Sequence, residues 1–136
     1  ICETGTKLNA EISTELIGNI FYVGSPMHDG ATIIRGDRIL AAGCVLPLTQ
    51  DNTLGRELGT RHRAGLGITE NSDAMVLIVS EETGIISLAV DGRLTRFLDI
   101  KSVEKTILNF YLTDVEATVP KMPFIDKIRR TKDGQK

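Results

Sequence analysis

Three short polar clusters in this sequence carry side chains that could act on a phosphorylated substrate. The segment from Gly59 to Arg63 places an imidazole between two guanidiniums, directly after a glycine-punctuated turn. Arginine binds phosphate oxygens through paired N–H groups, and the free amides at the start of a helix form a second anion site. The segment therefore predicts a polyphosphate site. Its residues equally fit an ordinary surface helix start with a partly buried histidine.

The other two clusters contain carboxylates. His28 to Ala31 stand at the start of a predicted strand, where Asp29 could accept a hydroxyl proton and Gly30 could let a substrate lie against the backbone, although Asp-Gly is also common in simple turns. Ser80 to Glu82 follow an apolar strand; acids there could hold Mg²⁺ or Mn²⁺, although adjacent acids in a turn are more often only solvated. Together the three clusters have the chemistry of phosphoryl transfer.

Length and composition limit the classes of protein to consider. The chain has 136 residues, of which 41% are hydrophobic and 25% charged, as expected of one globular domain. Its net charge of −2 argues against a broad basic surface for nucleic acid, and 4% aromatic residues without tryptophan argue against a stacking platform for single strands. We therefore expect no nucleic-acid partner.

The cysteines and the apolar runs indicate the kind of cellular environment in which the chain folds. Cys2 and Cys44 are far apart in the sequence, and Cys44 lies in an apolar run where a thiol behaves as a small hydrophobe, which suits a reducing environment. No apolar run approaches the roughly 20 residues needed to cross a bilayer. The chain begins at Ile1 rather than Met, so we expect it to be part of a longer protein.

Hydrophobic periodicity and turn residues predict the elements that position these clusters. Apolar residues at three- and four-residue steps indicate helices, and apolar or β-branched runs on either side of Gly-Asp or Asp-Gly indicate hairpins. The helices are expected over 9–22, 56–68 and 103–111, and the strands over 31–35, 38–46, 74–79, 85–90 and 94–97. We predict an α/β fold with a mixed central β-sheet flanked by helices on both faces.

Particular residues refine this prediction. Strand 38–46 is nearly all apolar and is expected in the middle of the sheet. Asn9 and Ser102 are expected to cap their helices. Glycines at 59, 65 and 67 weaken the prediction of a helix over 56–68, and we interpret them as allowing phosphates to approach the backbone.

The order and spacing of the clusters resemble the catalytic domain of bacterial diadenylate cyclases. The two signature motifs of that family, Asp-Gly-Ala and Arg-His-Arg, are present here as Asp29 to Ala31 and Arg61 to Arg63, and Ser80 to Gly84 follows the next strand. The resemblance extends from about Glu3 to about Leu112. It is greatest to the membrane-anchored branch of the family.

The resemblance implies condensation of two ATP molecules into cyclic di-AMP with release of two pyrophosphates, by two domains that meet face to face as a homodimer. By motif, Asp29 activates the ribose 3′-hydroxyl, and Gly30 and Ala31 let the nucleotide approach. The remaining implied roles are metal contact, by His28 and Glu82, with Mn²⁺ or Mg²⁺ as cofactor, and ATP binding, by Leu46, Thr60, Arg61, His62, Arg63 and Ser80. Leu46 is expected to border the adenine.

The family comparison also sets expectations for the rest of the chain. The catalytic domain is expected over 1–113, without the helix and strand that open family domains, and 114–136 is expected to be a flexible, basic, polar tail. A regulatory protein partner is expected. The full-length protein is expected at the cytoplasmic face of the cell membrane, through segments outside this chain. The alternative to an enzyme is a catalytically silent regulatory module that binds ATP or cyclic di-AMP.

Overall fold

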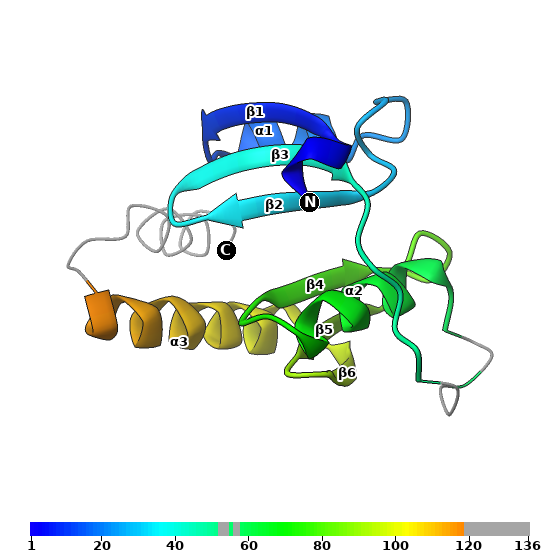
Figure 1. The fold of residues 1–136 in the computed structure, drawn as a ribbon, viewed down its shortest axis with the longest axis vertical. Coiled ribbons are helices and arrows are strands. Elements are labelled where there is room, and N and C mark those ends of the chain that lie inside the picture. The colour runs from blue at the N-terminus through cyan, green and yellow to red at the C-terminus, as the bar shows by residue number, and fades with distance from the viewer. Residues whose placement is uncertain (52–54, 56–57, 119–136) are drawn as a thin grey trace. The chain divides into compact units, whose positions relative to one another are not determined.

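The chain folds into two compact units in a computed structural model that describes residues 1–51, 55 and 58–118. The first unit comprises residues 1–45 together with the chain from 104 onward, and the second comprises residues 46–103. Figure 1 labels the helices and strands of both units. Strands and α-helices occur together along the described chain, and this confirms the predicted α/β class.

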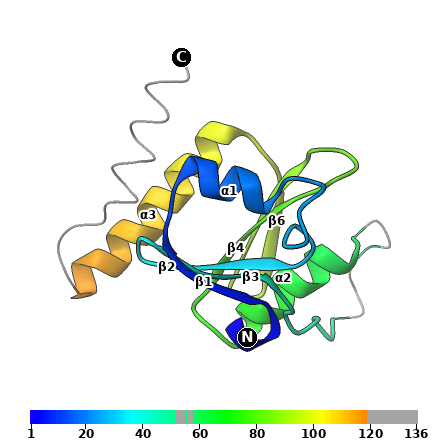
Figure 2. The same cartoon turned by 90° about the horizontal axis from the view of Figure 1, so that it is seen from above.

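The first unit is built on a three-stranded antiparallel sheet in the order β1-β3-β2. Its elements are a short 3-10 helix η1 (Cys2–Thr4), β1 (Thr6–Glu11), α1 (Thr14–Ile20), β2 (Ala31–Arg35) and β3 (Arg38–Cys44). The middle position of β3 agrees with the prediction from its apolar sequence, although the strand ends at Cys44. Figure 2 shows α1 lying along one face of this sheet.

The predicted helix over 9–22 is wrong over residues 9–11, which belong to β1, and α1 begins only at Thr14. The side chains of β1 alternate between exposed and half-buried over its last four residues, and this two-residue alternation overlaps the first turn of the helical pattern. Asn9 is not a cap, because it lies within the strand at a φ of +46°. The cap is Ser13, whose hydroxyl oxygen accepts a hydrogen bond from the Leu16 backbone N–H at 3.1 Å.

Apolar side chains from α1 and the sheet form the core of the first unit. Its fully buried members are Ile12, Ile20, Ile39 and Ala42. Cys44 is also buried, and both cysteines are free thiols. Burial and the nearby Cys2 raise the pKa of the Cys44 thiol, so it behaves as the small hydrophobe that its apolar surroundings predict.

The second unit contains α2 and a second antiparallel sheet in the order β4-β5-β6. Its elements are α2 (Thr60–Glu70), β4 (Met75–Val79), β5 (Ile86–Val90) and β6 (Arg93–Leu98). Leu66 of α2 packs against Ile78 and Ala89 of the sheet. The predicted β5–β6 hairpin is confirmed, with positive φ at both Asp91 (51°) and Gly92 (73°), as a tight two-residue turn requires.

The arrangement of the strands differs from the predicted single mixed sheet. Among the described residues, the strands form two sheets of three, and all four strand pairs are antiparallel. Short turns join β2 to β3, β4 to β5 and β5 to β6, and a short turn can only connect antiparallel neighbours. The apolar character of β3 and β4 indicated burial, which by itself does not determine the direction of a neighbouring strand.

The helix α3 (Ile100–Thr118) is longer than the predicted helix and continues past residue 113, the expected end of the domain. Its cap is Asp99 rather than Ser102, because the Asp99 carboxylate accepts a hydrogen bond from the Ser102 backbone N–H at 2.7 Å. Hydrogen bonds from Ser102 hold the pKa of Asp99 below its usual value. The Tyr111 hydroxyl donates to the Gly36 carbonyl at 3.2 Å, which ties α3 to the β2–β3 turn. The predicted tail beyond Thr118 lies outside the described residues.

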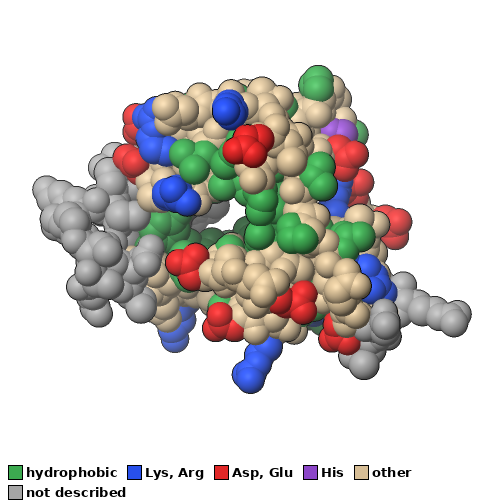
Figure 3. Space-filling view, viewed as in Figure 1, with side chains coloured by type: hydrophobic (Ala, Val, Ile, Leu, Met, Phe, Trp, Pro, Cys, Tyr) green, Lys and Arg blue, Asp and Glu red, His purple; other side chains and the backbone are tan. Residues whose placement is uncertain are grey.

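The helices and one face of the described structure bear on two expectations, which concern membranes and nucleic acid. No helix in the described part of the chain is both long enough and apolar enough to span a bilayer. On the face drawn in Figure 3, acidic and basic side chains are interspersed. This face therefore lacks the broad basic stripe that is typical of a duplex-binding surface.

Candidate functional site

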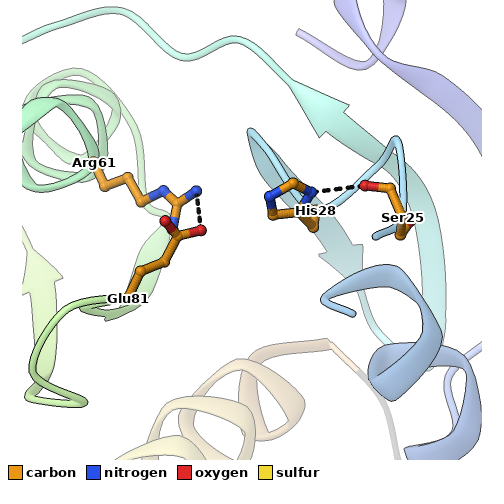
Figure 4. A network of polar contacts seen from close by, with 4 residues as sticks. All are labelled: Ser25, His28, Arg61 and Glu81. Carbon is orange, nitrogen blue, oxygen red and sulfur yellow. Dashed lines mark hydrogen bonds and ion pairs between the residues drawn. The ribbon is translucent and has the colours of Figure 1, made fainter. Parts of the chain in front are cut away.

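The loop between α1 and β2 holds the first predicted cluster, and a serine fixes its shape. The Ser25 hydroxyl accepts a hydrogen bond from the Met27 N–H at 3.1 Å, and the Ser25 carbonyl accepts one from the His28 N–H at 3.2 Å. The same carbonyl is 2.7 Å from Nδ1 of the His28 ring, a contact drawn in Figure 4. Sequence reasoning missed Ser25, although a serine directly before Pro26 is a frequent turn-former.

These hydrogen bonds assign the tautomer of His28. A carbonyl oxygen can only accept, so Nδ1 must carry the proton. This is the tautomer in which histidine can bind a metal or accept a proton through Nε2.

The signature Asp29-Gly30-Ala31 ends this loop and enters β2. Asp29 is exposed, and Gly30 has a φ of +120°, a conformation that side chains other than glycine rarely adopt. Ala31 is the first residue of β2 and pairs with Cys44 of β3. The loop therefore presents a carboxylate to solvent beside an oriented imidazole, as the interpretation of Asp29 as a proton acceptor requires.

The signature Thr60-Arg61-His62-Arg63 forms the first turn of α2. The helix begins at Thr60 after the N-cap Gly59, which has no side chain with which to cap it. The first amides of a helix have no partner within the helix, and here Thr60 and two half-buried arginines, Arg61 and Arg63, belong to the same turn. This is the combination of backbone and guanidinium donors that a polyphosphate would engage.

The third predicted cluster adjoins the second. An Nη2 atom of Arg61 lies 2.8 Å from Oε1 of Glu81, in the turn after β4, as Figure 4 shows. The half-buried Ser80 shapes this turn, because its hydroxyl accepts a hydrogen bond from the Thr83 N–H at 3.3 Å. Glu82 is exposed in the same turn. The second and third predicted clusters thus meet within the second unit, with Glu81 as the direct contact of Arg61.

His62 points into the second unit. Three consecutive side chains on a helix spread over more than half of its circumference, so they cannot all face solvent. Only 8% of the His62 surface is exposed, and its Nε2 has no hydrogen-bond partner among the described residues. Burial and the positive charge of Arg96 lower the pKa of His62. The imidazole is therefore neutral at pH 7, and any charge for phosphate binding comes from the arginines on either side.

The segment before α2 packs tightly against the helix. A Cβ added at Gly67 would lie 2.1 Å from the Pro47 carbonyl oxygen, and one at Gly65 would lie 2.7 Å from the Ile78 side chain. These glycines therefore serve packing within the protein, and the interpretation that they admit phosphates is wrong for both. The Thr49 N–H donates to the Arg63 carbonyl at 3.0 Å. Leu46, the predicted neighbour of adenine, is half-buried at the start of this segment.

The predicted metal contacts are an imidazole and a carboxylate, which are suitable donor groups. His28 lies in the first unit, and the exposed Glu82 lies in the second. Within the described ranges, no three His, Cys, Asp or Glu side chains are grouped to hold an ion. Mg²⁺ usually keeps several waters and binds through one or two carboxylates together with substrate phosphates, and an incomplete protein ligand set fits an ion of this kind.

Comparisons with known proteins relate these motifs to a family. Residues 1–94 match the family model described as DisA bacterial checkpoint controller nucleotide-binding. A diadenylate cyclase of Listeria monocytogenes is 49% identical over 111 residues, which are 82% of this chain and 41% of the relative. Cyclic di-AMP synthase CdaA of Bacillus subtilis is 48% identical over 105 residues, 77% of this chain and 38% of the relative.

Solved structures agree with the sequence relatives. A double-mutant crystal structure of DacA from Staphylococcus aureus superposes with a TM-score of 0.78 at 44% identity and covers 81% of this chain and 73% of that one. The structure of a hypothetical membrane spanning protein from Bacillus cereus has a TM-score of 0.68 at 48% identity and covers 71% and 47%.

The chain thus spans about two fifths of the length of the curated relatives named above. Both signature motifs lie inside the 94 residues that match the family model. The chain belongs to the family of DisA-type bacterial nucleotide-binding domains.

Proposed function

We propose that this domain is a diadenylate cyclase, which condenses two ATP molecules into cyclic di-AMP and two pyrophosphates. The observation that carries the proposal is the first turn of α2, which follows an N-cap without a side-chain cap and carries Arg61 and Arg63, a combination that suits a bound anion. The names of relatives that are nearly half identical support the choice of reaction. Neutral His62 leaves the two arginines as the source of positive charge.

In the proposed reaction, the 3′-oxygen of one ATP bonds to the α-phosphorus of another. The bond from that phosphorus to the bridging oxygen breaks, pyrophosphate leaves, and the hydroxyl proton passes to Asp29. The arginines of α2 stabilise the negative charge that develops on the phosphates. A second such step closes the ring, and it requires that two domains associate with their nucleotides facing each other.

We further propose that the reaction depends on a divalent metal, Mn²⁺ or Mg²⁺, held by His28 and Glu82 together with the nucleotide. When bound, such an ion would neutralise charge on the phosphates. The fixed orientation of the His28 ring supports its part in this assignment, because the Ser25 carbonyl accepts a hydrogen bond from Nδ1.

The direct test is to incubate the purified chain with ATP and either metal and to identify products by mass spectrometry. We expect cyclic di-AMP and pyrophosphate, and loss of both with Asp29→Asn. The matched control is Asp91→Asn, which removes the same charge in a hairpin turn at a φ of +51° that asparagine tolerates. A folded, dimer-forming protein that binds ATP and makes no product with either metal would instead select the silent regulatory module.

Mixed dimers test the two-domain arrangement. With wild-type chains in excess over Asp29→Asn chains, each mixed dimer retains one active aspartate and should form only one of the two phosphodiester bonds. We therefore expect a linear dinucleotide to accumulate in proportion to the mixed dimers. If cyclic product falls with no linear intermediate, the proposal that each domain supplies one of the two attacks is wrong.

We propose that the full-length protein lies at the cytoplasmic face of the cell membrane. The Bacillus cereus relative, which is named a membrane spanning protein, supports this location. Fractionation of cells that express the full-length protein tests it, and recovery in the soluble fraction would contradict it. Co-purification from the same membranes would identify a regulatory protein partner.

A further inference from the structure

Gly43 occupies a backbone irregularity in β3, directly opposite the Asp29 loop. Its φ is +67°, in the left-handed region that favours glycine. The pairing of β2 with β3 shifts here, because Ala31 pairs with Cys44 but Ile33 pairs with Ala41. Two β3 residues thus stand opposite one β2 residue, which is a β-bulge with glycine at its left-handed position.

The Asp29 loop rests on this bulge without any side chain between them. A Cβ added at Gly30 would lie 2.7 Å from the carbonyl carbon of Gly43 and 2.9 Å from both the Gly43 Cα and the Cys44 oxygen. Directly after η1, a Cβ at Gly5 would lie 2.7 Å from the Cys44 sulfur and 2.9 Å from its nitrogen. The backbone of β3 is therefore in close contact with Gly30 at Gly43 and Cys44, and with Gly5 at Cys44.

We propose that Gly43 is a positioning residue for Asp29, because its left-handed bulge sets the surface on which the Asp29-Gly30 peptide rests. The expected effect on kcat rests on the proposed function, whereas the expected effect on the Asp29 loop rests on the geometry of the first unit. Bulges beside active sites commonly direct a side chain. The carboxylate needs such support, because Asp29 itself is exposed on a loop.

Replacing Gly43 with alanine should disturb the backbone rather than create a clash. The nearest atoms to an added Cβ are the Met27 Cα at 3.7 Å and the Asp29 oxygen at 3.8 Å, which is ordinary contact. The penalty comes from φ, and the chain can relieve it only by turning the peptide on which Gly30 rests. Since misplacement by about 1 Å can cost about 100-fold in rate, we expect Gly43→Ala to lower kcat by about 10- to 100-fold.

Two further variants separate positioning from general destabilisation. Gly43→Asn keeps a residue that adopts left-handed φ more readily than alanine, so it should recover part of the lost kcat. Gly92→Ala is the matched control, because Gly92 has a φ of +73° and an added Cβ there would meet the Glu70 side chain at 3.5 Å, an ordinary contact. It imposes similar strain in the second unit, which does not contain Asp29, and should leave kcat within twofold.

Three measurements on the full chain test the proposal. Calorimetry with a non-hydrolysable ATP analogue should give a Kd for Gly43→Ala within twofold of the parent, because the triphosphate donors lie on α2. Initial rates should show that kcat is highest for the parent protein, lower for Gly43→Asn and lowest for Gly43→Ala. Amide hydrogen exchange at Met27 and His28, whose N–H groups donate to Ser25, should accelerate in Gly43→Ala and not in Gly92→Ala.

The exchange measurement separates this inference from the proposed function. If the parent makes no cyclic di-AMP, the proposed function fails, and exchange alone decides whether Gly43 supports the loop. The inference is overturned if Gly43→Ala keeps parental exchange at Met27 and His28. In an active parent it is also overturned if Gly43→Ala keeps parental kcat, if analogue affinity falls as far as kcat, or if asparagine performs no better than alanine.

Discussion

The ion pair between Arg61 and Glu81 predicts that removing an acid will tighten nucleotide binding. The two side chains are 39% and 57% exposed and lie 2.8 Å apart, and exposed pairs of this kind contribute about 0.2 to 1 kcal/mol. In the proposed function, Arg61 must exchange Glu81 for a triphosphate oxygen, so that free energy opposes binding. Glu81→Gln should therefore lower the Kd for an ATP analogue by about 1.4- to 5-fold.

The assay is calorimetry with a non-hydrolysable ATP analogue at low and high salt. Because exposed charges are screened, the gain in affinity should shrink as ionic strength rises. Glu70→Gln is the control, since it removes an equal charge from the other end of α2. The reasoning is refuted if Glu81→Gln weakens binding, which would indicate that Glu81 preorganises Arg61, or if Glu70→Gln gives the same gain, which would indicate a general charge effect.

The remaining predictions concern stability, pH and metal. Ser13→Ala should lower the free energy of unfolding by about 1 kcal/mol in urea titrations, because it removes the cap of α1. Gly67→Ala should destabilise by about 1 to 3 kcal/mol because of its 2.1 Å approach to Pro47, whereas Gly18→Ala, with no atom within 4 Å, should stabilise by about 0.5 to 1 kcal/mol. The pKa of His62 is lowered in the folded state, so the unfolded chain binds the extra proton and stability should fall as pH drops below about 6.5; His62→Gln should flatten that dependence. Glu82→Gln should raise the Mn²⁺ concentration needed for half-maximal activity, and an unchanged metal dependence would remove Glu82 from the metal site.

The parts of the fold that the sequence predicts correctly are those determined by local signals. Asp91-Gly92 predicts its hairpin because both residues tolerate positive φ, and the apolar run of β3 predicts a strand in the middle of a sheet. β1 was missed because Leu8 and Ala10 fit a strand, whereas Ile12 and later residues fit a helix. Two overlapping periods cannot be separated without knowing the partner strand.

The candidate site also combines predictable and unpredictable features. Helical geometry requires that some of the side chains of Arg61, His62 and Arg63 turn away from solvent, and the structure shows that His62 is buried. Its neighbour Arg96 could have been found, since it occupies a half-buried position between Leu94 and Leu98 on an alternating strand. The contact of Glu81 with Arg61 depends on where the turn after β4 lies against α2, and no spacing in the sequence encodes that placement.

Glycines mark the limit of what the motifs reveal about the site. Gly30 and Gly65 are the same residue type beside similar signatures, yet Gly30 rests on the backbone of a bulge and Gly65 admits the side chain of Ile78. Glycine is required at each position because another residue occupies the space that a Cβ would fill, and that residue is distant in sequence in both cases. Gly43 belongs to neither signature, yet the geometry of the Asp29 loop depends on it. The residues proposed to carry the chemistry can therefore be chosen from the sequence, whereas the backbone that holds them in position becomes visible only in the folded chain.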